Sequence, residues 1–418
     1  MHERLVEVGQ RGLTVRSLGG SRAGEMRITR FLRNPKVSVE EIFATAAEGT
    51  AGRVEGLHVL AIQDTTSLRD DGAGQGLVAH PTIALEAESG ALLGLAHGEI
   101  LSRKGGQRAS RKARPITDKQ SQRWLDGAAA GQRLIEAGAA RVTVVADREG
   151  DIYEMFALKP ADVELLIRAG QNRALAGEAG LLFAALAERP EAGRFTLALP
   201  AAPGRKARRL TLALRFCPVA LKQPASRPAA AGLPEAAPAF LVEAREIDPP
   251  EGVTPAHWRL LTSHRIERLD QARWIAGLYR KRWVIEQLFR TIKSKGFDIE
   301  RVTMAEAPFE ILAASALVAG VSCLQLVQDR DGLAKRPLQD VFQPEERPVL
   351  EALSARLEGR TEKQKNPHAK GSLAFAAWVC ARLGGWTGYY GKPGPVVMLR
   401  GLYQFRAMQQ GWSLAQDV

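Results

Sequence analysis

The stretch from Leu278 to Lys293 constrains this chain most, because its polar residues are spaced to share one face of a helix. These polar residues are Tyr279, Arg282, Glu286 and Lys293. At about 100° per residue, the last three lie roughly 300°, 340° and 320° around the helix axis from the first. Apolar residues occupy the adjacent arc, so the sequence predicts one continuous helix with its polar stripe at the edge of a core. A carboxylate beside two cations and a phenol suits a site for metal and phosphate.

Two aspartates each follow an apolar run that is typical of a buried strand. Asp64 follows the run from Leu57 to Gln63, and Asp147 follows the run from Arg141 to Ala146. Neighbouring strands that stop at one edge of a sheet bring the residues after them together. The sequence therefore predicts that Asp64 and Asp147 lie close together.

Three motifs in this order resemble the DDE transposases of the insertion-sequence-four family, the group that contains the transposon-five transposase. The helix has the family's Y-x2-R-x3-E-x6-K order, Asp64 stands in Gln63-Asp64-Thr65-Thr66, and Asp147 begins Asp147-Arg148-Glu149-Gly150-Asp151. The resemblance extends from about Gly20 to Gly385 and beyond. It implies that Asp64, Asp147 and Glu286 are catalytic and bind Mg²⁺, for which Mn²⁺ can substitute. Oxygen-only ligation suits both ions.

The resemblance also implies an α/β fold class: a ribonuclease H-like catalytic core, with a mixed sheet and flanking helices, interrupted by an antiparallel β insertion and followed by a helical C-terminal region. Alternating runs between residues 158 and 262, beginning with 163–167, favour such an insertion. The expected division is a short N-terminal segment (1–45), the first part of the core (46–158), the insertion (159–262), the second part of the core (263–331) and a dimerisation region (332–418).

Residues expected to contact DNA follow from the same resemblance. Tyr279, Arg282 and Lys293 are expected near the cleaved phosphate, and Arg168 and Arg173 are further candidates for phosphate contact. Trp258 matches the position that stacks a flipped base, with a buried core tryptophan as the alternative. Trp283 also matches and is a candidate for contact with the DNA hairpin.

The charge balance is consistent with a polyanionic partner. Lys and Arg total 58 against 46 Asp and Glu, a formal net charge of +12. Two basic runs, 103–114 and 205–209, either follow a DNA backbone or are solvated loops. Cys217, Cys323 and Cys380 are expected to be reduced, buried thiols, as in a cytosolic protein. The apolar stretch 311–328 predicts a buried helix, with no membrane association.

The leading functional interpretation is a cut-and-paste transposase that nicks element ends, forms and resolves hairpins, and joins the 3′ ends to target DNA. Double-stranded DNA and a second subunit in a synaptic homodimer are its expected partners, in the bacterial cytoplasm at the nucleoid. The alternative is an N-terminally shortened derivative that dimerises with full-length transposase and inhibits it. A domesticated nuclease is a third reading. The first twenty residues are expected to be poorly ordered, with structure beginning near Gly24. The C-terminal helices, including Ser372–Trp378, are expected to dimerise.

Overall fold

The computed structural model describes residues 1, 4–6, 13–70, 76–103, 121–177, 180–187, 189–199, 207–225, 232–293, 296–389 and 391–416. The chain divides into two compact units. The first, here called the sheet unit, comprises His58–Asp64 and Gly106–Arg282. The second, the helical unit, comprises Met1–Leu57, Thr65–Gly105 and Trp283–Val418. Each unit is described on its own.

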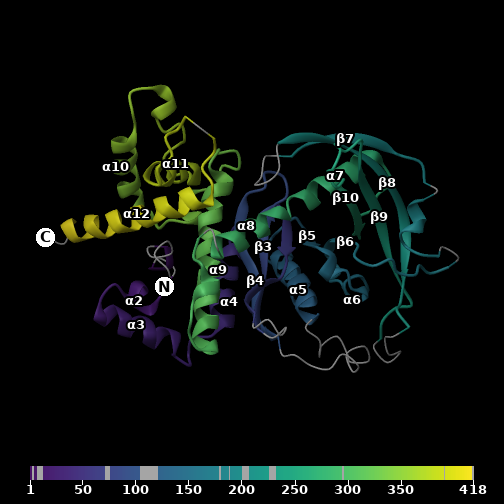
Figure 1. The fold of residues 1–418 in the computed structure, drawn as a ribbon, viewed down its shortest axis with the longest axis horizontal. Helices are drawn as coiled ribbons and strands as arrows, with labels where there is room; N and C mark the ends of the chain where they lie inside the picture. The colour runs from purple at the N-terminus through teal and green to yellow at the C-terminus, as the bar shows by residue number, and fades with distance from the viewer. Residues whose placement is uncertain are drawn as a thin grey trace. The chain divides into compact units, whose positions relative to one another are not determined.

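The sheet unit contains a mixed sheet with two kinds of pairing (Figure 1). Its strands, in spatial order, are β1 (His58–Gln63), β5 (Arg141–Ala146), β6 (Val163–Arg168), β10 (His257–Thr262), β9 (Ala236–Ile247), β8 (Arg208–Lys222) and β7 (Gly193–Leu199). The first three run parallel, and every later neighbour pairs antiparallel. A mixed α/β architecture was predicted, and the strands before Asp64 and Asp147 are confirmed.

Strand β6 corrects one prediction. The run 163–167 was grouped with the antiparallel insertion, but β6 is parallel to β5 and follows it through the short helix α6 (Tyr153–Ala157). Helices cover both faces of parallel strands, so buried residues follow one another with little alternation. In β6, Val163, Leu165, Leu166 and Ile167 are all buried. A short apolar run does not reveal the direction of its partner, which explains the error.

Helices lie on both faces of the sheet. Helix α5 (Gln122–Glu136) packs on the face of β5 that carries Val142 and Val144; a Cβ on its Gly131 would lie 3.0 Å from Val144 Cγ2. Thr143 points to the opposite face, because side chains alternate along a strand. On that face, Trp274 of α7 (Leu269–Arg280), a helix that packs on β8 and β9, lies against two histidines that bond to Thr143.

The two histidines below Trp274 form a polar bridge across the sheet. His58 Nε2 and His264 Nε2 lie 2.9 and 2.8 Å from the Thr143 hydroxyl oxygen. Burial, and to a lesser extent the nearby positive charge of Arg141, lowers the pKa of each imidazole to about 4. Both rings are therefore neutral at pH 7. Neutral rings also suit the shared Thr143 hydroxyl, which can donate a hydrogen bond to one ring and accept one from the other.

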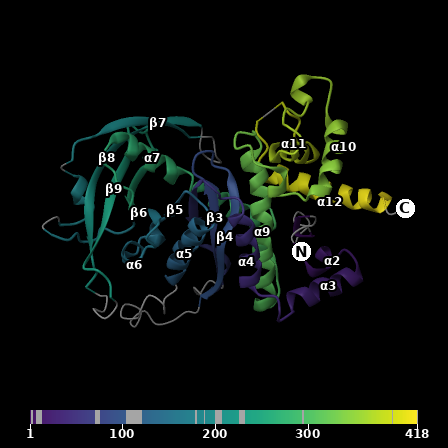
Figure 2. The same ribbon diagram turned by 180° about the vertical axis from the view of Figure 1, so that it is seen from behind.

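The helical unit combines a three-stranded antiparallel ladder with helices (Figure 2). Its strands are β2 (Thr66–Asp70), β3 (Gly76–Glu86) and β4 (Leu92–Arg103), and β3 and β4 flank the predicted turn, where Gly90 has φ 80°. Helix α4 (Val39–Ala51) packs on β4 so closely that a Cβ at Gly98 would lie 2.9 Å from the Phe43 ring. Ser38 caps this helix, since its side chain accepts a hydrogen bond from Glu41 N.

Helix α9 (Glu306–Asp329) is the centre of the helical unit and contacts β4, α4, α8 (Trp283–Ile292), α11 (Leu373–Leu383) and α12 (Pro395–Gln416). By length and composition it alone among the described helices qualifies as a membrane span. However, 83% of its most apolar window is buried inside the protein, as predicted for a core helix. It lies against α8 at Gly320, where an added Cβ would meet Leu288 Cδ1 at 2.9 Å.

Order begins earlier than predicted. Helix α2 (Val15–Gly19) precedes α3 (Arg22–Leu32), so the expected start near Gly24 is wrong. A reciprocal capping box between Thr14 and Ser17 fixes the first turn of α2, a local device that does not depend on apolar periodicity. At the other end of the chain, α10 (Arg347–Leu357), α11 and α12 confirm a helical region after Gly332. All three cysteines are free and buried, as predicted.

Candidate active site

The two aspartates end neighbouring strands at the same level of the sheet. Strands β1 and β5 are parallel and paired in register from His58 with Arg141 to Ile62 with Val145. Asp64 and Asp147 each stand two residues beyond that last pair. The predicted meeting of the aspartates at one sheet edge is therefore confirmed. Asp64 is 7% exposed, while Asp147 is half-buried.

An arginine contacts the more buried aspartate. Arg282 Nη1 lies 2.6 Å from Asp64 Oδ2, and the two side chains are only 12% and 10% exposed. An ion pair this short is a charge-assisted hydrogen bond, which is about twice as strong as a neutral one. Arg282 was predicted to contact a DNA phosphate, and its pairing with Asp64 was not foreseen.

Arg282 reaches Asp64 from a turn, which corrects the prediction of one continuous helix. Helix α7 ends at Arg280 and α8 starts at Trp283. The amides of Lys281 and Arg282 bond to carbonyl groups three residues earlier, a tightening typical of a helix end. The four predicted polar residues thus do not share one helical stripe. Periodicity alone did not reveal this break, because the run contains neither Gly nor Pro.

Tyr279 lies in the last turn of α7, surrounded by charged residues of the sheet unit. Burial raises its pKa, whereas the cations of Arg282 and Arg168 lower it and Asp147 raises it. Its hydroxyl is buried and, among the described residues, makes no hydrogen bond of ordinary geometry. Arg168 nevertheless lies close enough to stabilise the deprotonated phenolate form and so to lower the pKa. A buried donor without a partner is costly and marks a position where a ligand oxygen would be favourable.

Trp258 packs against this tyrosine. The two ring centroids are 5.8 Å apart at an interplanar angle of 61°, an edge-to-face arrangement. Trp258 is half-buried on β10, so it is not a fully buried core residue, and its base-stacking role stays a prediction. Arg168, on the neighbouring strand β6, donates to the carbonyl group of His257 over 3.1 Å.

The buried carboxylate of Asp151 holds the turn after β5 in place. No role was predicted for this residue from the sequence. Asp147 Oδ1 accepts a bond from Glu149 N over 2.8 Å, which closes the turn locally. Asp151, fully buried, accepts bonds from Gly170 N and Gln171 N and pairs with Arg173. Burial raises the pKa of Asp151, while Arg173 and the two amides lower it. We call this set of bonds around Asp151 the clamp. The D-R-E-x-D pattern, which ends at Asp151, was the sequence signal that could have indicated it.

Arg173 serves that clamp in the structure. Its Nη2 also donates to the Asp151 carbonyl oxygen over 2.7 Å, and its side chain is 10% exposed. This geometry gives Arg173 a structural position, and the phosphate contact foreseen for it stays a prediction.

The remaining predicted residues belong to the helical unit. Glu286 is half-buried on α8, and Lys293 follows that helix and pairs with Glu300 over 2.9 Å. Trp283, the first residue of α8, is 52% exposed and has the Arg290 guanidinium 5.4 Å from its ring centroid. His80, predicted to lie in the core, is fully buried with Nδ1 2.9 Å from the Thr65 hydroxyl oxygen.

The donor set at the sheet edge fits a hard divalent cation. Asp64 and Asp147 offer carboxylate oxygens in register, and these are the ligands that Mg²⁺ and Mn²⁺ prefer. Asp64 already attracts a cation, since Arg282 lies on it. Across the residues that the structure describes, no group of three or more His, Cys, Asp or Glu is arranged to hold a metal. The sheet edge thus supplies two of the three predicted ligands.

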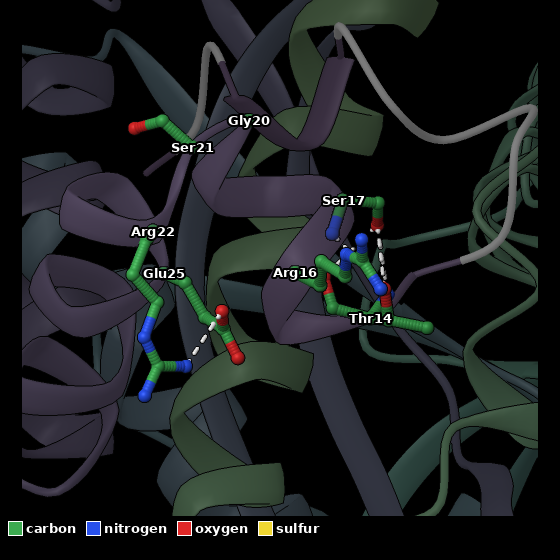
Figure 3. Close-up of a pocket in the computed structure, with 7 residues that line it drawn as sticks. All are labelled: Thr14, Arg16, Ser17, Gly20, Ser21, Arg22 and Glu25. Carbon is green, nitrogen blue, oxygen red and sulfur yellow. Dashed lines mark hydrogen bonds and ion pairs between the residues drawn. The ribbon is translucent and has the colours of Figure 1, made fainter.

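Two other features were weighed as sites. Most of the two predicted basic runs, residues 104–114 and 205–206, lies outside the described residues. Asp118, which the sequence predicts to cap a helix, lies outside them too. Within the second run, Arg208 pairs with Glu246 on the adjacent strand. A cavity of about 800 Å³ lies at helices α2 and α3 (Figure 3). Its lining is Thr14, Arg16, Ser17, Gly20, Ser21, Arg22 and Glu25. It includes no residue of the predicted site.

A comparison with known families agrees with the geometry at the sheet edge. A family model described as "Transposase DDE domain" matches residues 58–308, more than half of the chain's 418 residues. The match begins at the first residue of β1 and includes Asp64, Asp147 and Glu286. The chain therefore belongs to the DDE transposase family.

Proposed function

We propose that this protein is an active cut-and-paste transposase in which Asp64, Asp147 and Glu286 form the catalytic triad. The observation that carries the proposal is the in-register placement of Asp64 and Asp147 at the ends of parallel strands. Membership of a family that cleaves and joins DNA with divalent metal ions supports it. A closer relationship to the insertion-sequence-four group is part of the proposal and rests on the Y-x2-R-x3-E-x6-K pattern.

The three carboxylates would hold Mg²⁺, or Mn²⁺ in its place. Bound metal ions supply an activated oxygen nucleophile and stabilise the leaving oxyanion of a phosphodiester. The residues of the chain align the DNA around that centre. We assign Arg282 and Arg168 to phosphate oxygens of the DNA, with Tyr279 as a third donor; the influence of both arginines on Tyr279 supports this assignment.

Trp258 is the residue we assign to a base displaced from the duplex during hairpin formation. It is half-buried with its ring edge-to-face on Tyr279, so a base that stacks on it would lie next to the proposed phosphate contacts. Stacking on an aromatic ring contributes about 1–3 kcal/mol per base, which offsets much of the cost of unstacking the base from the duplex. Trp283 and Lys293 are proposed as further DNA contacts from the helical unit.

We also propose that the protein acts as a homodimer in the bacterial cytoplasm. The predicted dimer segment Ser372–Trp378 falls largely within α11, which is buried in its own unit. Helix α12 has exposed apolar side chains, with Trp412 at 40% and Leu414 at 69% exposure. Helix α12 is therefore the better candidate for subunit contact, and light scattering of Trp412→Ser against wild type would test it.

The decisive assay is strand cleavage of a supercoiled plasmid that contains the DNA flanking this gene, with Mg²⁺ or Mn²⁺. Asp147→Ala is the test variant, and Asp162→Ala, an exposed aspartate before β6, is the matched control. Site-specific cuts by wild type and the control, absent in Asp147→Ala, would support the proposal. A folded wild-type dimer that never cuts would instead favour the inhibitory derivative.

A further inference from the structure

Arg282 is bound to a residue that the reaction needs free. Its Nη1 lies 2.6 Å from Asp64 Oδ2, at an oxygen that a divalent ion would use. Both side chains are about nine-tenths covered, so water screens the pair poorly. An arginine held in this way is a built-in competitor of the metal.

We propose that Arg282 is an internal cation that closes Asp64 to divalent metal until a DNA phosphate draws the guanidinium away. This inference rests on the proposed function and adds an order of assembly to it. Metal and DNA would then bind cooperatively at Asp64. The protein without DNA would bind metal weakly and be protected from unspecific cleavage.

Electrostatics sets the direction of the effect. A divalent ion that approaches Asp64 meets a fixed positive charge and must displace a charge-assisted hydrogen bond. Hydrogen bonds to charged groups contribute about 1.5–3 kcal/mol, and each 1.4 kcal/mol corresponds to tenfold in affinity. Loss of the competitor should therefore strengthen metal binding about tenfold or more.

The surroundings of Arg282 provide a destination for the released guanidinium. Tyr279 is influenced by both Arg282 and Arg168, and its buried hydroxyl makes no ordinary hydrogen bond to the described residues. A phosphate at this position would give the tyrosine an acceptor and would replace the Asp64 carboxylate as the partner of Arg282. Arginine binds phosphate and carboxylate with the same bidentate geometry, so the exchange requires little rearrangement.

The turn that carries Arg282 makes the exchange structurally simple. The residue stands between α7 and α8, outside the regular hydrogen bonding of both helices. A side chain on a two-residue turn can change its partner without unwinding a helix. Coupling is reciprocal, so the factor by which DNA tightens metal binding equals the factor by which metal tightens DNA binding.

The test is Mn²⁺ binding to the full chain without DNA, measured by electron paramagnetic resonance of the free ion. We compare wild type with Arg282→Gln, and with Arg280→Gln as a control that removes an equal charge from the exposed end of α7 but not the contact with Asp64. Arg282→Gln should bind Mn²⁺ about tenfold more tightly, and the control should change by less than about threefold. Thermal melting verifies folding, and Arg282→Lys, which keeps the charge, should give an intermediate affinity.

The second arm adds a mixed-sequence DNA duplex at low salt. The duplex should tighten Mn²⁺ binding to wild type and have a smaller effect on Arg282→Gln. Equal Mn²⁺ affinities for wild type and folded Arg282→Gln would overturn the exchange but leave the transposase proposal intact. If Asp64→Asn with the duplex binds Mn²⁺ as tightly as wild type with the duplex does, the metal site itself is wrong and both proposals fail.

Discussion

The sheet unit and the helical unit present their predicted site residues in different ways. In the sheet unit, Asp64, Arg282 and Tyr279 are mostly buried. Arg282 pairs with Asp64 at the end of β1 and lies close enough to Tyr279 to lower its pKa. In the helical unit, Glu286 is half-buried, and Trp283 is 52% exposed. One half of the predicted site is thus preorganised by burial and ion pairing, and the other half is more open to solvent. Preorganised charges act most strongly on a reacting group.

The largest expected effect comes from the buried acid of the sheet unit. Asp64→Asn keeps the size of the side chain but removes the negative charge, so Mg²⁺-dependent plasmid cleavage should fall below detection. The variant also loses its ion pair with Arg282, so circular dichroism must show that it folds. Asp162→Asn, at an exposed position, is the control. Cleavage by folded Asp64→Asn at the wild-type rate would remove the sheet unit from catalysis.

Trp258→Ala is expected to have the next largest effect. Because base stacking contributes about 1–3 kcal/mol, hairpin formation should slow about tenfold, and first-strand nicking should change less. Trp274→Ala, which removes an aromatic ring of the same unit from its contact with His58 and His264, should slow neither step selectively. Gel analysis of nicked and hairpin products measures both rates. Equal slowing of the two steps would argue for a packing role alone.

Acid should weaken the sheet unit. The pKa of His264 is lowered from 6.5 to about 4 by burial and the nearby cations, so between these values the unfolded chain binds a proton that the folded chain does not. Stability is therefore complete above about pH 6.5 and is lost as the pH falls towards 4, by at most about 3 kcal/mol for this ring. Amide hydrogen exchange of β5 at pH 4.5 and pH 7 tests this. Equal protection at the two pH values would contradict it.

The helical unit should respond to pH in the opposite sense. Burial raises the pKa of Asp329 at the end of α9 from 3.8 to about 6. Stability is complete below about pH 3.8 and is lost as the pH rises through 6, because the folded state holds the proton more tightly. Asp329→Asn should therefore stabilise α9 by about 2 kcal/mol at pH 8 and hardly at all at pH 4. Thermal melts of Asp329→Asn and wild type at both pH values give the difference in stability. If the variant were less stable than wild type at pH 8, the fold would require the charged carboxylate and the prediction would be wrong.

Local patterns predicted the parts of the site that depend on single strands. Arg141–Ala146 matches β5 as predicted, and the placement of Asp64 beside Asp147 followed from where two strands stop. The direction of β6 and the break at Lys281 depend on partners distant in sequence. Hydrophobic periodicity and secondary-structure propensity, which are local, therefore did not reveal them. The clamp at Asp151 and the pairing of Arg282 with Asp64 likewise join residues from separate segments. Tertiary contacts decide such features.

One measurement tests most directly whether the two units serve a single reaction: Mg²⁺-dependent cleavage by Glu286→Gln. Glu345→Gln changes an exposed glutamate of the same unit and is the control. If Glu286 completes the triad, the variant keeps its fold and loses cleavage as fully as Asp64→Asn does, while the control cuts normally. A folded Glu286→Gln protein that cuts at the wild-type rate would contradict the assignment.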